Sequence, residues 1–132
     1  MTKLSAGIIV IGNEVLSGRT QDTNSNFIAK NLIESGIELM QIIVIQDNEE
    51  IIIDTVRNFS NKYTYVFTTG GIGPTHDDIT SESLAKAFNT KYDFHPEAYK
   101  ILENYYPVGE FNEGRKKMAK MPIGVKLIHN PI

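Results

Sequence analysis

A chain of 132 residues with 41% hydrophobic and 22% charged residues is typical of a folded protein, which excludes intrinsic disorder and predicts one domain, residues 1–132. The formal charge of -3 excludes a broadly basic surface for nucleic acid, and the lack of cysteine excludes disulfides and thiolate metal sites. No apolar stretch reaches the ~20 residues of a membrane helix or follows a signal-peptide pattern. We therefore expect a cytoplasmic protein that binds neither membranes nor nucleic acid.

Apolar runs and helical patterns alternate along the first third of the chain. The run 6–11 is typical of a strand that is buried on both faces. Asp22 or Thr23 can cap the next helix, and Gly36 suits its C-terminal end. The apolar residues of this helix recur at helical spacing: Phe27, Ile28, Leu32 and Ile33. A second strand is predicted over residues 37–45.

The segment after Asn48 is ambiguous between helix and strand. Ile52, Val56 and Phe59 fit one face of a helix. Three consecutive isoleucines, residues 51–53, keep a strand as the alternative because β-branched side chains favour extended backbone. We predict the helix here.

The rest of the chain is predicted to continue with a strand and three helices, and to end on another strand. The strand 63–69 leads into a glycine-rich turn, and Thr80 can cap the helix that follows. A proline at the first helical position starts a helix at Pro96. A basic helix over residues 112–121 and a last strand over residues 125–130 complete the prediction.

Repeated strand–helix units predict an α/β fold: a three-layer sandwich with a mostly parallel open sheet and helices on both faces. In such sheets, ligands bind outside the carboxyl ends of the strands. The turns after three predicted strands therefore meet at one edge. These turns carry Asn13 and Glu14, Asp47 and Asn48, and the segment 70–78.

The stretch VFTTGGIGPTHDDIT contains a turn that is suited to binding an anion. Gly70, Gly71 and Gly73 can adopt positive φ and let a ligand approach the backbone, so that their amides can face a phosphate. The stretch matches neither the lysine-containing phosphate loop nor the dinucleotide fingerprint. The alternative is a tight turn with a purely structural role.

Two adjacent acids, Asp77 and Asp78, follow this turn. Like charges repel each other, so a cation, backbone donors or a helix N-terminus must compensate them. A hard divalent ion such as Mg²⁺, held through carboxylate oxygen, can bridge to phosphate oxygens and activate a pyrophosphate. The alternative is that both aspartates are capping or solvated residues.

Further polar residues are expected near the same edge. Glu14 or Asp47 can add a carboxylate to a metal site or accept a hydrogen bond from a ribose hydroxyl, and Asn24 can supply an amide. Lys117 or Lys116 can neutralise a second phosphate if the basic helix folds over this edge. Ordinary loop acids and a solvated helix face are the alternatives.

The segment TTGGIGPTHDDITSESLAKAF, residues 68–88, resembles the signature T-G-G-x-G-P-T-x-D-D-x-T of the competence/damage-inducible protein A family. This family is a branch of the molybdopterin-binding domain superfamily. IGNEVLSGRTQDTNS and IQDN are similar to its first two loops, and GRKKMAKMPIGVKLIHNP is similar to its basic helix and final strand. A twelve-residue motif between a strand and a helix is a specific signal.

The resemblance implies a nucleotide- or pterin-phosphate site with a divalent metal (Mg, Mn, Ni or Co), in a chain that forms dimers or trimers. It implies catalytic roles for Asp77 and Asp78, which would hold the metal together with Asp47. Residues expected to bind substrate are Gly70, Gly71, Gly73, Glu14, Asn24, Lys117 and Asn130.

Relatives in this family suggest two reactions. Metal-dependent hydrolysis of ADP-ribose or a similar nucleotide diphosphate is our first hypothesis. The second is Mg²⁺-dependent adenylyl transfer to molybdopterin, in which the aspartate matching Asp78 takes part. A binding module without turnover is the third.

The sequence departs from the family pattern in two places. Residues 115–119 read RKKMA where many longer members have NRKQA. The family's asparagine–proline motif continues into a loop that completes the substrate pocket, whereas this chain stops at Ile132, so we expect a C-terminally truncated domain. The amidohydrolase domain of long members has no counterpart in these residues.

Overall fold

The computed structural model, which describes residues 3–129, is built on a three-stranded parallel sheet. Its strands are β1 (Ser5–Ile11), β2 (Glu38–Ile45) and β3 (Tyr65–Thr69), in the order β2-β1-β3. Because β1 is central, β2 pairs with one of its edges and β3 with the other. The order places the reversal of the winding between β1 and β3, where doubly wound folds bind ligands.

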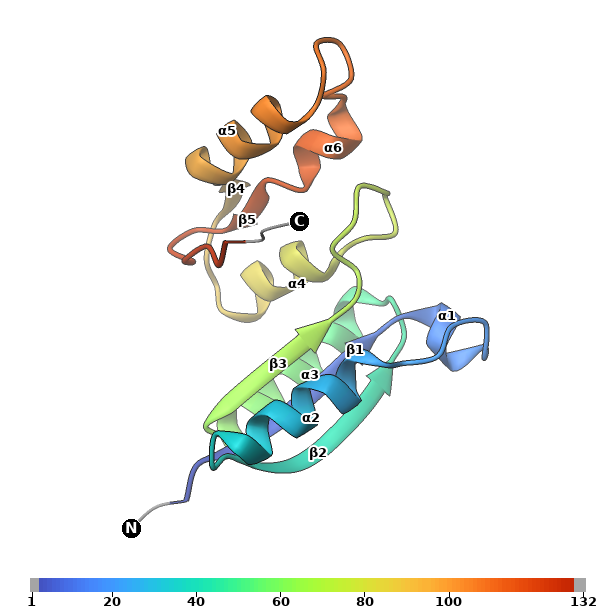
Figure 1. Ribbon diagram of the computed structural model, residues 1–132, viewed down its shortest axis with the longest axis vertical. Helices are drawn as coiled ribbons and strands as arrows, with labels where there is room; N and C mark the ends of the chain where they lie inside the picture. The colour runs from blue at the N-terminus through green and yellow to red at the C-terminus, as the bar shows by residue number, and fades with distance from the viewer. Residues whose placement is uncertain (1–2, 130–132) are drawn as a thin grey trace.

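Helices cover both faces of this sheet, as predicted. Figure 1 shows α2 (Asn24–Glu34) on one face and α3 (Glu49–Lys62) on the other. Asn48 caps α3, accepting a hydrogen bond from the amide of Ile51 at 3.1 Å, so the helical alternative was correct for this segment. The fold class of the prediction is therefore confirmed: a mostly parallel α/β sheet between helical layers.

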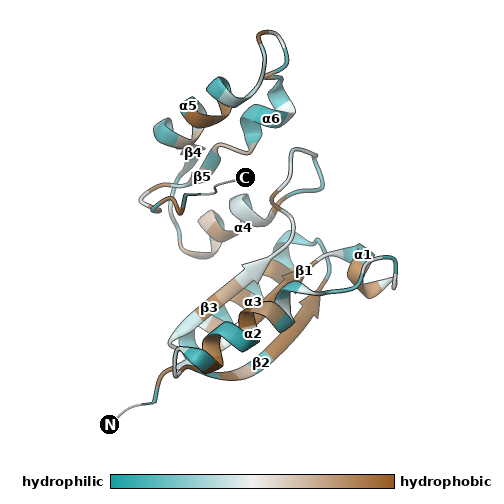
Figure 2. Cartoon of the chain, viewed as in Figure 1, coloured by the Kyte–Doolittle hydropathy of each residue, from teal (hydrophilic) through white to brown (hydrophobic). Residues whose placement is uncertain are grey.

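The core lies between the sheet and α3, and it consists mostly of aliphatic side chains. Its buried members are Ile9, Ile11, Ile45, Ile52, Val56, Phe59 and Ala87. In Figure 2 the largely brown β2 shows how apolar this strand is, whereas β3, which contains two threonines, is paler. Gly7 interrupts the large residues of β1 because the Phe59 ring lies 2.6 Å from the position that a Cβ would occupy there.

A second group of elements lies beyond the sheet. In Figure 1, α4 (Thr80–Ala87) lies between the sheet and a small unit of α5 (Pro96–Tyr105), α6 (Glu113–Lys117) and the antiparallel pair β4 (Tyr92–Phe94) and β5 (Lys120–Pro122).

Aromatic contacts hold this small unit together. The Tyr99 ring packs edge-on against Phe94 at 5.3 Å and against Phe111 at 5.1 Å between ring centroids. Such pairs stabilise a unit that contains few buried aliphatic side chains.

The end of the chain differs from the sequence prediction. Residues 125–129 form no strand, and Asn130 lies outside the described residues. The last strand is instead β5, in the segment that we assigned to the basic helix, and α6 is correspondingly short. An extended run forms a strand only when another strand satisfies its backbone groups, and β4, which the prediction missed, pairs with β5.

One further helix was not predicted: the short α1 (Asn13–Leu16) after β1. Across residues 3–129, no helix is both long and apolar enough to span a bilayer.

Substitution of Phe59 tests the packing of the core directly. Phe59→Ala should lower the free energy of unfolding by about 3–5 kcal/mol, because it removes a fully packed ring and leaves a cavity. Urea unfolding followed by circular dichroism measures the loss. Asn58→Ala, an exposed neighbour on α3, is the control and should change stability by less than about 0.5 kcal/mol. A loss for Phe59→Ala as small as that of the control would contradict this description of the core.

Candidate functional site

The glycine turn is tied to the end of β1 and to the start of α4. Gly70 has φ +90°, and a Cβ there would lie 2.0 Å from the Ile11 carbonyl oxygen, so no other residue fits. The buried Thr80 hydroxyl donates to the Gly70 carbonyl at 2.8 Å, and the Thr80 amide donates to the Gly71 carbonyl at 3.1 Å. The prediction of Thr80 as a helix cap was therefore wrong, because Ile79 occupies the capping position.

Asp78 is held by the residue three positions before it. The Thr75 amide and hydroxyl both donate to Oδ2 of Asp78, at 2.9 and 2.8 Å. Partial burial is the largest influence on the pKa of Asp78 and opposes ionisation. The Thr75 donors, the Gly73 amide and the Lys117 charge outweigh it, so the pKa lies below its ordinary value of 3.8.

Asp77 points into a more open environment. Its carboxylate lies 3.3 Å from Nε2 of His76, and both side chains are largely exposed. Two adjacent aspartates thus have different surroundings: Asp78 is fixed by hydrogen bonds, whereas Asp77 is solvated and pairs with a neighbouring imidazole. The alternative of capping or solvated residues fits Asp77 better than Asp78.

Asp47 and Asn13 join two of the turns at the carboxyl edge. The backbone amide of Asn13 donates to Oδ2 of Asp47 at 3.2 Å, and the backbone amide of Asp47 donates to the side-chain Oδ1 of Asn13 at 3.1 Å. This reciprocal pair fixes the turn after β1 against the turn after β2. One oxygen of Asp47 already accepts a hydrogen bond, which leaves Oδ1 as its more available oxygen.

A central cavity of about 540 Å³ collects most of the predicted acids. It brings together side chains from the turns after all three parallel strands, and Gly71 forms part of its wall. Its lining residues are Asn13, Glu14, Arg19, Asp47, Gly71, Thr75, His76, Asp77, Asp78 and Ile79. Four carboxylates in one hollow produce a negative potential that attracts a cation.

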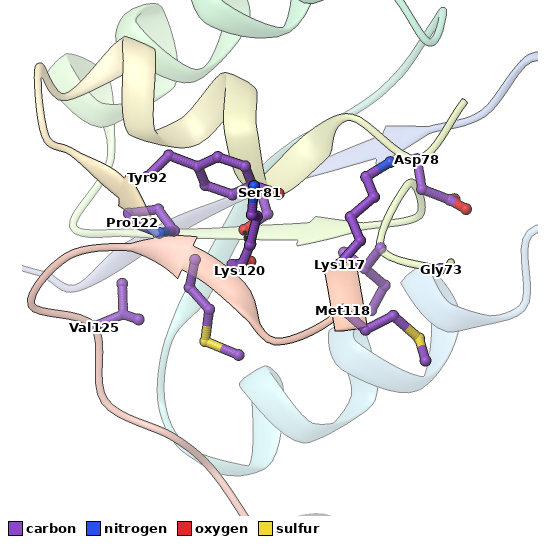
Figure 3. Close-up of a pocket in the computed structure, with 11 residues that line it drawn as sticks. Gly73, Asp78, Ser81, Tyr92, Lys117, Met118, Lys120, Pro122 and Val125 are labelled. Carbon is purple, nitrogen blue, oxygen red and sulfur yellow. Dashed lines mark hydrogen bonds between the residues drawn. The ribbon is translucent and has the colours of Figure 1, made fainter. Parts of the chain in front are cut away.

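A second cavity, of about 300 Å³, borders the first at Asp78. Figure 3 shows Tyr92, Lys120 and Pro122 from the β4–β5 pair on one side, while the Lys117 side chain extends toward Asp78. Its walls are mainly apolar. The lining residues are Ile72, Gly73, Asp78, Ser81, Tyr92, Lys117, Met118, Lys120, Met121, Pro122 and Val125.

A third cavity, of about 210 Å³, borders the central one at Glu14. Its lining includes Gly70, the ends of β1 and β3, and Asn24 at the start of α2. Gly70, Gly71 and Gly73 therefore line three adjoining cavities, whereas we expected their amides to face a single phosphate.

The basic helix reaches the glycine turn through one lysine. The Lys117 ammonium donates to the Thr75 carbonyl. The Lys116 ammonium instead pairs with Glu113 at 3.3 Å. Asn130, the remaining residue expected to bind substrate, lies outside the described residues.

The acids of the central cavity could hold a divalent metal only together with oxygen atoms of a ligand or of water. Within residues 3–129, no three histidine or acidic side chains converge closely enough to hold an ion by themselves. Mg²⁺ typically takes one or two carboxylates together with water and phosphate oxygens, so Asp78 with Asp77 or Asp47 fits such an ion.

The sequence did not point to several residues of these cavities, among them Arg19, Thr75, Tyr92 and Lys120. The spacing of Thr75 and Asp78 is a signal that could have been used, because aspartate side chains often accept hydrogen bonds from nearby backbone amides in turns. Tyr92 and Lys120 come together through the β4–β5 pairing, 28 positions apart in the chain, and no local pattern predicts that.

The sheet order and the loop cavities define an α/β domain with adjoining cavities at the carboxyl edge of its parallel sheet, the place where open α/β folds bind ligands. The family described as "Probable molybdopterin binding domain" matches residues 7–126, and the chain belongs to this family.

Individual relatives agree with this assignment. A "Putative competence-damage inducible protein" of Alkaliphilus metalliredigens is 37% identical over 130 residues, which cover 97% of this chain and 32% of the relative. A "Probable FAD synthase" of Caenorhabditis elegans is 43% identical over 103 residues, 78% of this chain and 20% of the relative. The chain spans between about a fifth and a half of the length of these curated relatives, at 20% for the FAD synthase and at 49%, 32% and 53% for three others.

The fold has a similar counterpart among crystal structures. The protein CinA from Thermoplasma acidophilum, described as having unknown function, matches with a TM-score of 0.92 at 32% identity. The match covers 99% of this chain and 78% of that one. The resemblance to the competence/damage-inducible protein A family is therefore confirmed.

Removal of the Thr75 hydroxyl tests whether its hydrogen bond lowers the pKa of Asp78. Thr75→Val should raise the pKa of Asp78 toward 3.8, because the variant removes a donor that favours the carboxylate. Since the native pKa is depressed, this bond stabilises the fold above pH 3.8, and its contribution is lost as pH falls through the native pKa. Carboxyl ¹³C shifts recorded against pH in the metal-free protein measure the change. Thr75→Ser, which keeps the hydroxyl, should titrate like the wild type, and an unmoved pKa in Thr75→Val would contradict the prediction.

Proposed function

We propose that the domain binds a nucleotide diphosphate along its carboxyl edge and, with a divalent metal, hydrolyses the pyrophosphate bond. The observation that carries this proposal is the position of Asp78 at the border of two cavities. One cavity is rich in carboxylates and suits a metal ion, while the other is apolar with two lysines and suits a phosphorylated organic group. A pyrophosphate that lies across this border would contact a metal ion in the first cavity and the lysines of the second.

The adjoining cavities match an extended ligand such as ADP-ribose. The third cavity meets the central one at Glu14, and the central one meets the second at Asp78. A ligand with a sugar or base at each end and a pyrophosphate between them can occupy the row. The second cavity offers Tyr92 and methionine side chains to a flat ring, and Lys120 to a phosphate.

The residues around the reacting phosphates have separate tasks in this proposal. Asp78 is ionised at neutral pH, as an aspartate of ordinary pKa already is, and its lowered pKa suits the role of a metal ligand and not that of an acid. Asp77 or Asp47 completes the carboxylate set, and Arg19 offers a guanidinium to phosphate oxygens. A divalent metal bound to these carboxylates would offset phosphate charge and lower the pKa of a bound water.

Adenylyl transfer to molybdopterin or a related pterin is the second candidate, and the family description supports its pterin-binding part. Molybdopterin combines a flat pterin ring with a phosphate group, and it suits the second cavity by the same chemistry. The two reactions differ in products: hydrolysis of ADP-ribose releases AMP and ribose phosphate, whereas transfer from ATP releases pyrophosphate.

One experiment separates these functions. Purified protein is incubated with ADP-ribose, with FAD, and with ATP plus molybdopterin, each with and without Mg²⁺, Mn²⁺, Ni²⁺ or Co²⁺, and the products are identified by mass. AMP from ADP-ribose supports the first proposal, and adenylylated pterin supports the second. If neither product forms with any metal, both enzymatic proposals fail, and calorimetry with the same compounds then tests the third hypothesis, a binding module.

Asp78→Asn tests the central residue of the proposed hydrolase. The variant should lower kcat for ADP-ribose by about 100-fold or more, because the amide neither carries the charge nor accepts a proton. The free energy of unfolding should change by less than about 1 kcal/mol, since the side chain lies on a loop. Asp54→Asn, an exposed site on α3, is the control and should retain full activity. Equal activity of the two variants would show that Asp78 is dispensable.

A further inference from the structure

The helix α6 contacts the loop that carries the acidic pair, and Lys117 makes the polar part of this contact. Its ammonium donates to the Thr75 carbonyl, which also accepts the Asp78 amide at 3.2 Å. The same threonine donates twice to Oδ2 of Asp78. Thr75 therefore connects Lys117 to Asp78 through both its backbone and its side chain.

The position of α6 is fixed by packing as well as by charge. Gly114 lies so close to the loop that a Cβ there would be 2.9 Å from the Pro74 carbonyl oxygen. Asn112 caps the helix by accepting from the Arg115 amide at 2.9 Å. The Arg115 guanidinium lies 4.4 Å from the Tyr106 ring centroid and donates to the Glu110 carbonyl at 2.6 Å. These contacts fix α6, and therefore the backbone of Lys117, beside the loop.

We propose that Lys117 and Thr75 are positioning residues: α6, acting through Lys117 and then Thr75, sets the orientation of the Asp78 carboxylate. This inference rests on the proposed function for its catalytic consequence, because Asp78 is the residue that would act on the pyrophosphate. In this proposal Lys117 holds the loop of Asp78, whereas from the sequence we expected it to neutralise a substrate phosphate.

The hydrogen bonds show what this positioning achieves. Both Thr75 donors use Oδ2, so they fix one oxygen and leave Oδ1 outside that pair of bonds. A carboxylate held by one oxygen presents the other in a constant direction to a ligand. If Lys117 is removed, the Thr75 carbonyl loses its link to α6, and the turn that carries both donors is free to shift.

The two roles of Lys117 predict different kinetics with ADP-ribose and Mn²⁺. A lysine that binds a substrate phosphate mainly raises KM when it is removed, whereas a positioning lysine mainly lowers kcat. We expect Lys117→Met and Thr75→Val each to lower kcat by about 10- to 100-fold, with KM changed by less than about threefold. Thr75→Ser should retain kcat to within about threefold because it keeps both donors.

A double-mutant cycle tests whether the two residues act in one chain of contacts. The kcat of the Lys117→Met/Thr75→Val protein should fall by less than the product of the two single losses, because both changes weaken the hold of the same turn on Asp78. Lys116→Met removes a neighbouring charge on α6 that pairs with Glu113, and it should leave kcat and KM within about twofold of the wild type. Multiplicative losses, or a raised KM with unchanged kcat in Lys117→Met, would overturn the proposal.

Amide hydrogen exchange gives a readout that does not depend on activity. NMR suited to rapidly exchanging amides should show exchange at Thr75 and Asp78 faster by about tenfold in Lys117→Met, with the wild-type rates in Lys116→Met. Amides of β1 serve as an internal check that the variant is folded. If the loop amides exchange alike in both variants, the positioning role is refuted. If they respond as expected but the wild type hydrolyses no ADP-ribose, the proposed function fails while the structural relay stands.

Discussion

The carboxyl edge of the sheet depends on the close approach of the glycine turn to β1. Gly70 lies against the Ile11 carbonyl, where no Cβ fits, and the buried Thr80 hydroxyl holds the Gly70 carbonyl from the other side. This contact joins the end of β3 to the start of α4, so the intervening loop leaves the sheet at a fixed point. The positions of Thr75, Asp77 and Asp78 all follow from it, and so do the borders between the three cavities.

The charge distribution around this turn is uneven in a way that suits its proposed ligand. Four carboxylates line the central cavity, while the lysines of α6 and β5 lie on the far side of Asp78. An anion alone would be repelled by the acidic side, whereas an anion with a metal ion satisfies both sides. A solvated face was one interpretation of the basic helix, but three of its basic side chains make specific contacts. Arg115 lies over the Tyr106 ring, Lys116 pairs with Glu113, and Lys117 donates to the Thr75 carbonyl of the loop.

Much of the fold could be predicted because local patterns and burial agree there. The apolar run of β1, the Asn48 cap and the stripe of Ile52, Val56 and Phe59 each satisfy both a local preference and the core. Prediction was weaker where pairing between distant segments decides the structure. Residues 125–129 had the pattern of a strand and the β5 segment that of a helix end, but β5 is the segment that pairs with β4. Thr80 looked like a cap, and its hydroxyl is used by a glycine carbonyl ten positions earlier.

The sequence by itself determined the strand–helix alternation, the glycine turn and the presence of two acids directly after it, because these are properties of adjacent residues. The tertiary structure decided which acid is held, since partial burial, the Thr75 and Gly73 donors and the neighbouring Lys117 distinguish Asp78 from the exposed Asp77. It also decided that Tyr92 and Lys120 join Asp78 in one cavity. The physical reason is that a side chain's partners are set by which backbones pack together, and packing between segments far apart in the chain leaves no local pattern in the sequence.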